Sequence, residues 1–365
     1  MAELLVTGAA GFIGSNFVHY WLGRYAQDRV VVLDALTYAG HPGSLESAIA
    51  AGRCRLVRGD ICDGPLVESL LREHSVATVV HFAAESHVDR SISGPDEFIR
   101  TNIVGTHALL GACRKVWLQE GKAPQHRFHH VSTDEVYGSL GPTDPAFTET
   151  TAYAPNSPYS ASKAGSDHLV RAYHHTYGLS VTTSNCSNNY GPFHFPEKLI
   201  PLAIINLLHG RPVPVYGDGR NVRDWLYVED HCRAIDLVLA HGRPGEVYNV
   251  GGNSESENIV LVQQLCAVVD QLFATDSRLG ARFPQCPAAS GKSCGSLITF
   301  VKDRPGHDRR YAVDPSRIRN ELGFVPSVTL ADGLKRTVEW FCANQSWWSG
   351  VMDGSYRKWI AEHYG

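Results

Sequence analysis

Short apolar runs alternate with segments of helical periodicity along the first half of the chain. The periodic segments predict helices over residues 12–22, 65–73, 99–116 and 159–177. The apolar runs, most of which end in glycine or polar turn residues, predict buried strands at residues 4–6, 29–34, 55–58, 78–82, 128–132 and 181–184. Because strands that alternate with helices imply right-handed βαβ crossovers, we expect an α/β fold of the Rossmann type, a doubly wound parallel sheet with helices on both faces.

The regular alternation fades after Asn185, where glycine and proline become frequent and the predicted elements shorten. We therefore expect a first domain over residues 1–185, joined by segments near 223–250, and a smaller C-terminal α/β domain over 186–365. The second domain would cover the carboxyl edge of the sheet, where ligands bind in open α/β sheets. Residues 280–296 are the best candidate for a mobile loop.

Composition narrows the class of protein. The 365 residues are 43% hydrophobic and 19% charged, which favours a large core and excludes a disordered or fibrous chain. The net charge of −4 does not indicate binding to nucleic acid or to an anionic membrane, because both attract positively charged proteins. We expect no membrane helix, since no apolar run approaches ~18 residues, and no signal peptide. Nine cysteines without a Cys-x-x-Cys pair predict reduced thiols in a cytoplasmic protein and no metal site.

A glycine-rich turn follows the first predicted strand and opens the first helix. Gly8, Gly11 and Gly14 follow the spacing G-x-x-G-x-x-G, which permits a tight turn, close approach to a pyrophosphate and close helix packing. Asp34 ends the second strand, where a carboxylate would accept bonds from ribose hydroxyls and repel a 2′-phosphate, favouring NAD over NADP. Asp60, after the third strand, would reach the adenine. Ordinary turn chemistry is the alternative interpretation of both acids.

Candidate catalytic residues follow the fifth strand and open the fourth predicted helix. Tyr159 and Lys163 stand at i and i+4 on one helical face, and a cation beside the phenol would lower its pKa and make Tyr159 a base for a sugar hydroxyl. Thr133 could donate to the same hydroxyl. Asp134 and Glu135 follow Thr133 directly, and a simple dehydrogenase does not need two further acidic residues there. They suggest that the enzyme uses a separate general acid and general base. An exposed acidic loop is the alternative interpretation.

These motifs together resemble the extended short-chain dehydrogenase/reductase family and, within it, the dTDP-glucose 4,6-dehydratases. The resemblance covers most of the chain and rests on the segments 7–14, 82–91, 133–138, 159–163, 188–192, 223–230 and 303–311. It implies a redox role for Thr133, Tyr159 and Lys163, an acid role for Asp134 and a base role for Glu135.

The resemblance also implies which residues bind the ligands. The NAD site would contain Gly8, Gly11, Phe12, Ile13, Gly14, Asp34, Ala35, Leu36, Thr37, Asp60, Ile61, Phe82, Ala83, Ala84, Glu85, Ser86, Thr101, Tyr159, Lys163 and Asn189. The nucleotide-sugar site would contain Ser86, Thr133, Asn188, Lys198, Leu199, Pro214, Val215, Tyr216, Arg223, Asn258, Asp303, Arg304, Pro305, Gly306 and His307. Arg223 and Arg304 could each chelate a diphosphate.

The implied reaction is a dehydration that uses NAD and returns it unchanged. A dTDP-glucose would be oxidised at C4, lose water across C5 and C6 and receive the hydride at C6, giving a 4-keto-6-deoxy product for deoxysugar (for example rhamnose) biosynthesis. A homodimer through helices at about 95–118 and 157–177 is also implied. A nucleotide-sugar 4-epimerase or decarboxylase, which needs no acid pair, and a non-catalytic NAD sensor remain alternatives. The sequence does not distinguish a thymidine nucleotide from a uridine nucleotide as the substrate. The two bases differ by one methyl group, whose recognition contributes only about 1–3 kcal/mol of discrimination.

Overall fold

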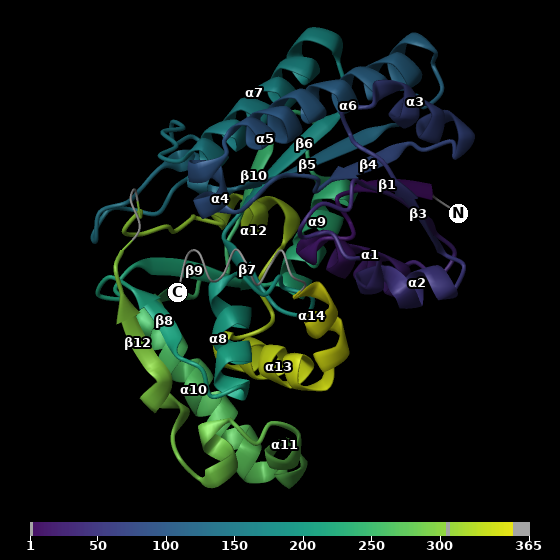
Figure 1. The fold of residues 1–365 in the computed structure, drawn as a ribbon. Helices are drawn as coiled ribbons and strands as arrows, with labels where there is room; N and C mark the ends of the chain where they lie inside the picture. The colour runs from purple at the N-terminus through teal and green to yellow at the C-terminus, as the bar shows by residue number, and fades with distance from the viewer. Residues whose placement is uncertain (1–2, 304–306, 353–365) are drawn as a thin grey trace.

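The computed structural model describes residues 3–303 and 307–352 and contains a seven-stranded parallel sheet (Figure 1). The strand order is β3-β2-β1-β4-β5-β6-β10, and every neighbouring pair is parallel. The predicted doubly wound fold is therefore confirmed. The strands are β1 (Glu3–Thr7), β2 (Arg29–Asp34), β3 (Cys54–Arg58), β4 (Thr78–His81), β5 (Arg127–Thr133), β6 (Val181–Cys186) and β10 (Val247–Val250).

Helices cover both faces of this sheet, because alternate strand residues point to opposite sides. Leu5 and Val31 pack toward one helical layer, whereas Leu4 and Val30 pack toward the other. The first layer contains α3 (Gly64–Glu73), α4 (Val88–Ser93), α5 (Asp96–Phe98), α6 (Thr106–Cys113) and α7 (Pro158–Tyr177). The second contains α1 (Phe12–Arg24), the short α2 (Glu46–Ala50) and α9 (Val228–His241).

The helix expected at 99–116 is longer than predicted and is not a regular α-helix throughout. α-Helical α6 is flanked by two π-helical stretches, Ile99–Gly105 and Arg114–Gln119, which continue the helical path from α5. Such stretches leave no distinct signature in hydrophobic spacing, which explains why periodicity alone predicted one uniform helix.

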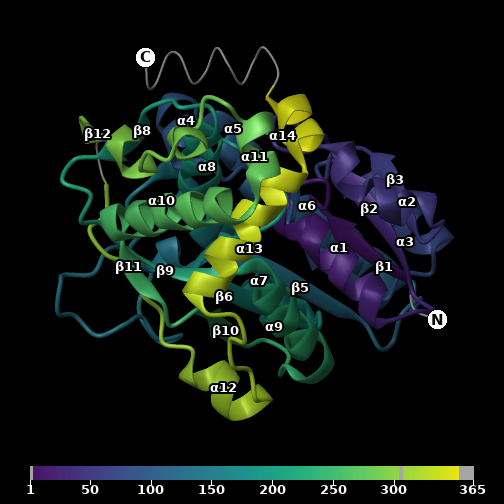
Figure 2. The same ribbon diagram turned by 90° about the horizontal axis from the view of Figure 1, so that it is seen from below.

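The second lobe lies against the carboxyl ends of the strands and has its own core (Figure 2). β9 (Val222–Tyr227) pairs in parallel with β7 (Asn188–Tyr190) and antiparallel with β11 (Glu255–Glu257), while β8 (Val213–Tyr216) pairs with β12 (Ile298–Val301). The helices of this lobe are α8 (Leu199–Leu208), α10 (Asn258–Thr275), α11 (Ser277–Arg282), α13 (Leu330–Ala343) and α14 (Gln345–Val351).

Segments from the second half of the chain, after residue 185, also belong to or contact the first lobe. β10 joins the first sheet beside β6, and α12 (Ser316–Leu322) packs against β10 and α9 through Ile318. Near the other end, Trp347 of α14 donates through Nε1 to the Ser44 hydroxyl at 3.1 Å. The expected division of the chain at residue 185 stays a prediction.

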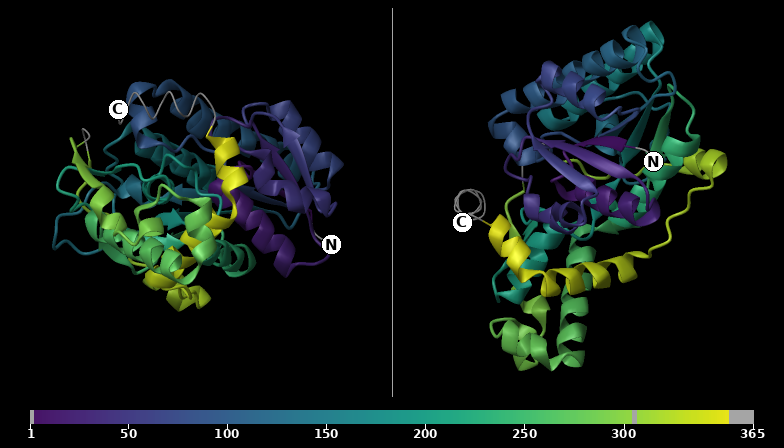
Figure 3. Two further views of the ribbon diagram at one scale, coloured as in Figure 1. Left: turned by 60° about the horizontal axis from the view of Figure 1, so that its bottom comes forward. Right: turned by 90° about the vertical axis from the view of Figure 1, so that its right-hand side faces the viewer.

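Two segments of the second lobe bear on the expectations from the sequence. A core helix can meet the criteria of length and composition for crossing a membrane, and α10 does so. It packs Leu261 and Leu265 into the core of this lobe. Residues 280–296 contain helical turns rather than an open loop, because Phe283, Cys286 and Cys294 are buried against the same core. This segment lies beside α11 at the end of the lobe farthest from the sheet (Figure 3).

Candidate active site

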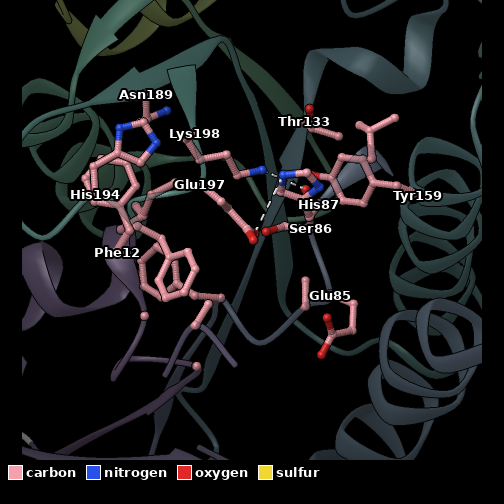
Figure 4. A pocket seen from close by; sticks show the side chains of 18 of the residues that line it. Phe12, Glu85, Ser86, His87, Thr133, Tyr159, Asn189, His194, Glu197 and Lys198 are labelled. Carbon is pink, nitrogen blue, oxygen red and sulfur yellow. Dashed lines mark hydrogen bonds and ion pairs between the residues drawn. The ribbon is translucent and has the colours of Figure 1, made fainter. Parts of the chain in front are cut away.

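A cavity of about 470 Å³ lies between the lobes, where β1 to β6 end. It brings together residues that are far apart in the sequence, as the close view of Figure 4 shows for Phe12, Thr133, Tyr159 and Asn189. The predicted residues that line it are Gly8, Gly11, Phe12, Ile13, Gly14, Asp34, Ala35, Thr37, Asp60, Ile61, Phe82, Ala83, Ala84, Glu85, Ser86, Thr101, Thr133, Asp134, Glu135, Tyr159, Lys163, Asn188, Asn189, Lys198, Leu199, Pro214, Val215, Tyr216, Arg223, Asn258 and His307.

The glycine-rich turn brings the backbone of β1 close to α1 and to the segment after β4. Gly8 has φ +70°, and a Cβ there would stand 2.5 Å from the Ala83 backbone. A Cβ on Gly14 would stand 2.7 Å from the Ala9 Cα atom. Gly11 is the N-cap of α1 and supplies no capping side chain, so the first N–H groups of the helix open on the cavity beside Phe12 and Ile13. This terminus fits a pyrophosphate.

Asp34 is held in place by backbone donors. Its two carboxylate oxygens accept from the N–H groups of Ala10 and Leu36, each at 2.8 Å. Burial raises the pKa of Asp34, and these two hydrogen bonds oppose the rise. The side chain lines the cavity one strand away from the glycine turn, so it is placed to accept from the ribose hydroxyls of NAD.

One predicted cofactor residue lies elsewhere. Leu36 does not line the cavity, and its side chain packs against the core beneath α1. Its backbone has φ +54°, a left-handed conformation that turns the side chain away from the path expected of an extended strand end. The contribution of Leu36 to this region is its N–H group, which donates to Asp34.

Asp60 is paired with an arginine that the sequence did not single out. Its carboxylate accepts from the Cys62 N–H group at 2.9 Å and from Arg100 Nη2 at 2.6 Å. Burial acts to raise the pKa of Asp60, but these two donors outweigh it and the pKa is lowered. Arg100 also lines the cavity. Arg100 is the second residue of the helix predicted at 99–116, and no sequence pattern indicated that it would pair with Asp60.

The catalytic candidates come from two neighbouring elements. Thr133 is the last residue of β5, and Tyr159 and Lys163 lie in the first two turns of α7. Lys163 is 4% exposed and donates through Nζ to the Val131 carbonyl at 2.9 Å. The side chains of Thr133 and Tyr159 lie close together in the wall of the cavity (Figure 4). The structure thus brings the three residues expected to perform the redox step to one place.

The protonation state of Tyr159 differs from the sequence-based expectation. Burial raises its pKa well above the usual value, the charge of Glu135 adds to this rise, and a hydrogen bond with Thr133 opposes it. Lys163, which was expected to lower the pKa of Tyr159, instead has its own pKa lowered by burial, and its ammonium is directed at Val131. Tyr159 therefore holds its proton in this structure.

Asp134 is a buried acid beside the tyrosine. Burial raises its pKa well above the usual range, and the nearby charges of Glu135 and Asp224 raise it further. Thr133 Oγ1 donates to Asp134 Oδ1 at 3.3 Å. No hydrogen bond to its Oδ2 atom comes from residues 3–303 or 307–352. Asp134 is thus a buried acid whose raised pKa favours the protonated form, whereas Glu135, next to it, is only partly buried. This difference fits a general acid beside a general base.

The second lobe contributes the opposite wall. Arg223 is buried, stacks over the Tyr311 ring at 4.3 Å and donates to the Asp308 carbonyl at 3.0 Å. Asn258 begins α10 and directs an amide into the cavity. Asp303 does not line the cavity, because it is exposed and its carboxylate accepts from His307 Nδ1 at 2.6 Å. Arg304, Pro305 and Gly306, also expected here, lie outside the described residues.

A buried cluster near Phe12 was not foreseen. His194 stacks on the Phe12 ring at 4.2 Å, and burial lowers its pKa to about 3. Glu197 is 3% exposed and accepts from Arg90 Nη2 at 3.0 Å, with His87 Nε2 3.7 Å from its other oxygen (Figure 4). Arg90 and Glu197 are 107 positions apart in the sequence, and Phe12 and His194 are 182 apart. Only the charged residue types near the proposed site could have drawn attention to this cluster.

Known proteins have sequences similar to this one over nearly the whole length of the chain. The family model for GDP-mannose 4,6 dehydratase matches residues 5–337. A dTDP-glucose 4,6-dehydratase of Xanthomonas campestris pv. campestris is 59% identical over 359 residues, covering 98% of both chains. A Salmonella typhimurium protein of the same name is 50% identical over 372 residues, covering 99% of both chains.

Solved structures give the same relationship in three dimensions. A dTDP-glucose 4,6-dehydratase from Streptomyces venezuelae, crystallised with NAD, is 48% identical, covers 96% of this chain and 99% of that one, and has a TM-score of 0.82. A UDP-glucose 4-epimerase from Thermotoga maritima is 28% identical at a TM-score of 0.79, covering 94% and 99%. The fold is thus common to both activities, while the high identity over nearly the whole length places this chain in the dTDP-glucose 4,6-dehydratase family.

Proposed function

We propose that this chain dehydrates dTDP-glucose to dTDP-4-keto-6-deoxyglucose with the help of bound NAD. The observation that carries the proposal is the pair Asp134 and Glu135 beside Tyr159. A buried acid with a raised pKa and a more accessible carboxylate stand next to the residue that would begin an oxidation. An epimerase needs the tyrosine but has no use for two further acids, so the pair favours an elimination.

The chain offers a fitting site for NAD. When bound, NAD supplies a hydride acceptor for C4 of the sugar and later the hydride for C6. The N-terminus of α1 would hold the pyrophosphate, and Asp34 would hold the adenosine ribose. Phe12 and His194, stacked on each other, exclude water from one side of this site. Lys163 lies where it can hold the second ribose.

Tyr159 is the proposed base for the C4 hydroxyl. Its Oη atom would take that proton as the hydroxyl becomes a ketone, and Thr133 would donate a hydrogen bond to the same oxygen. Because burial keeps the phenol protonated, a positive charge must lie nearby for the transfer to proceed at neutral pH. Lys163 and the cationic ring of bound NAD are the two sources of that charge.

Glu135 and Asp134 are the proposed base and acid of the elimination. A ketone at C4 acidifies the C5 proton, which Glu135 would remove. The electron pair of the C5–H bond would form the C5–C6 double bond as the C6 hydroxyl leaves. Asp134 would give its proton to that hydroxyl, so that water departs. As C6 receives the hydride, Glu135 would return a proton to C5. The proton that Tyr159 took from the C4 hydroxyl would replace, through solvent, the one that Asp134 gave up. Atoms and charge then balance, and the net reaction is loss of one water from the sugar.

Arg223 is placed to bind the nucleotide diphosphate, with Asn258 as a neutral donor or acceptor beside it. The thymidine base is proposed on the strength of the relatives, which carry dTDP-glucose in their names at 50–59% identity. The substrate wall formed by Pro214, Val215 and Tyr216 would then contact the nucleotide.

The experiment that tests the proposal compares dTDP-glucose with UDP-glucose and analyses the products by mass. We expect dTDP-glucose to be consumed faster and to give a product lighter by one water. Asp134→Asn should leave the binding of NAD intact and suppress the loss of water. A product of unchanged mass would replace the dehydratase proposal with the epimerase alternative.

We also propose that the protein is a cytoplasmic homodimer. Three apolar side chains are exposed on the helical layer expected to form the dimer: Ile92 at 49%, Ile99 at 46% and Val104 at 49%. They lie on α4 and on the π-helical stretch before α6, beside α7. Burying these side chains against a second copy would remove them from water. Nine free thiols are consistent with a reducing compartment.

A further inference from the structure

A third residue continues the face of α7 that bears Tyr159 and Lys163. Asp167 follows Lys163 by one helical turn, so the three residues stand at i, i+4 and i+8. Tyr159 and Lys163 line the cavity, whereas Asp167 does not. Asp167 is 6% exposed and therefore places a carboxyl group in the interior directly behind the catalytic pair.

Three donors from outside α7 converge on the Asp167 carboxyl. His130 Nε2, on β5, lies 3.0 Å from Oδ1. Ser132 Oγ, on the same strand, donates to Oδ2 at 2.9 Å, and Tyr153 Oη donates to Oδ2 at 3.0 Å. A carboxyl that accepts from three donors is built to be an anion, since each bond favours the charged form.

Lys163, one helical turn before Asp167 on α7, is the cation on which the charge of this carboxylate acts. Burial lowers the pKa of Lys163, and the negative charge of Asp167 acts against that loss. In return, burial raises the pKa of Asp167 to about 6, and Lys163 is the largest influence opposing the rise. The other titratable groups around Asp167 are His168 on α7, His130 on β5, and Tyr137 and Tyr153 from the segments between β5 and α7.

We propose that Asp167 is a positioning residue for the dehydration: its buried carboxylate keeps Lys163 in the ammonium form beside Tyr159. The proposal rests on the proposed function, because Lys163 matters there as a charge next to the phenol. A neutral Lys163 would no longer stabilise a phenolate at Tyr159. Ser132, His130 and Tyr153 would fix the carboxylate in turn. The Asp167 carboxylate would thereby link β5, which ends in Thr133, to α7, which carries Tyr159 in its first turn.

The test is Asp167→Asn, which keeps the shape of the side chain and removes its charge. Without the anion, the pKa of Lys163 falls, so the alkaline limb of the kcat profile should move by about one pH unit or more toward lower pH. kcat at neutral pH should fall about tenfold, with a smaller change in KM. Asp167→Glu restores the charge and should return the alkaline limb of the kcat profile to its original pH.

A matched control is available on the other face of the sheet. Asp236 on α9 is also 6% exposed and accepts from the hydroxyls of Tyr20 and Tyr25, both at 2.8 Å. Asp236→Asn removes a carboxylate of similar burial far from Lys163. It should lower the melting temperature without moving the pH profile. If Asp167→Asn behaves in the same way, its role is structural and the proposal is overturned.

A second readout does not depend on activity. In protein labelled with ¹³C at lysine Cε, and with Lys163 assigned through Lys163→Arg, the Lys163 resonance should titrate at lower pH in Asp167→Asn than in the unmodified protein. In the unmodified protein, the chemical shift of that resonance should also change as Asp167 takes up its proton near pH 6. This measurement does not depend on a variant that folds. An unmoved Lys163 titration, or no such step, overturns the proposal even if the dehydration itself is confirmed. A moved titration in a protein that does not dehydrate dTDP-glucose would instead count against the proposed function alone.

Discussion

Burial raises the pKa of three acidic side chains in the site. Tyr159, Asp134 and Asp34 are each less than a tenth exposed, and burial is the largest cause of the raised pKa of all three. For Asp34, two backbone donors oppose burial, which fits a carboxylate that accepts bonds from a ribose. For Asp134, one oxygen accepts from Thr133 alone, which fits an acid that keeps its proton until a leaving group needs it.

Tyr159→Phe tests the proposed base. The phenyl ring can still pack against Phe98, whose ring lies 6.3 Å from that of Tyr159, so the fold and NAD binding should be retained. Loss of the hydroxyl should reduce kcat by ~10²–10⁴-fold, the usual contribution of a general base. Steady-state kinetics and the NAD content of the purified variant measure both. A kcat within a few-fold of the unmodified enzyme would remove Tyr159 from this role.

Asp134→Asn should change how stability depends on pH. Because the pKa of Asp134 is raised in the folded protein, its contribution to stability is full below its ordinary pKa and is lost as pH rises toward the folded value. The asparagine variant has no proton to lose. Its melting temperature relative to the unmodified protein should therefore rise as the pH increases above about 4, the ordinary pKa of an aspartate, by about 2 °C or more. A difference that stays constant with pH would show that Asp134 ionises normally.

At the scale of elements, α7 carries Tyr159 and Lys163 and needs a firm start. Ser157 is its N-cap, with reciprocal hydrogen bonds of 3.0 Å between Ser157 and Ser160, and Pro158 occupies the first turn. Tyr159 stands two residues after the cap. The capping box therefore fixes the position of the phenol as well as the stability of the helix.

Ser157→Ala should lower both stability and turnover. Loss of an N-cap costs about 1 kcal/mol. Because fraying of the first turn displaces Tyr159, kcat should fall several-fold as well. Thr329→Ala is the matched control, since Thr329 caps α13 by accepting from the Asp332 N–H group at 3.2 Å and this helix contributes no residue to the cavity. Equal losses of kcat in the two variants would contradict the link between the cap and the phenol.

Hydrophobic spacing predicted the strands and main helices of the first lobe, because most of the strands contain a short run of buried apolar residues. Spacing could not show that Leu36 turns into the core, since that depends on a left-handed backbone conformation. It also misjudged residues 280–296, where glycine and proline suggested mobility but Phe283, Cys286 and Cys294 anchor the segment. The pairing of Arg90 with Glu197 joins separate elements and leaves no local pattern.

The whole molecule is expected to work as a pair of chains. If α4 and the helices beside it form the dimer interface, Val104→Glu should place a charge in an apolar contact and shift the protein toward the monomer. Light scattering during gel filtration measures the mass directly. Val325→Glu is a suitable control, because Val325 is also exposed, at 55%, but lies far along the chain, after α12. A dimer that survives Val104→Glu unchanged would contradict this interface.

In the proposed mechanism both lobes contribute to the elimination, because the first lobe would supply the acid pair and the second would supply Arg223 to hold the substrate. The most direct test follows the hydrogens of the sugar during one turnover in D₂O. If Glu135 removes the C5 proton, the 4-keto-6-deoxy product should carry solvent deuterium at C5. With substrate deuterated at C4 and run in ordinary water, that deuterium should appear at C6 of the same sugar. A product with no solvent deuterium at C5, or one that retains its C6 oxygen, would contradict the role of the acid pair and favour epimerisation.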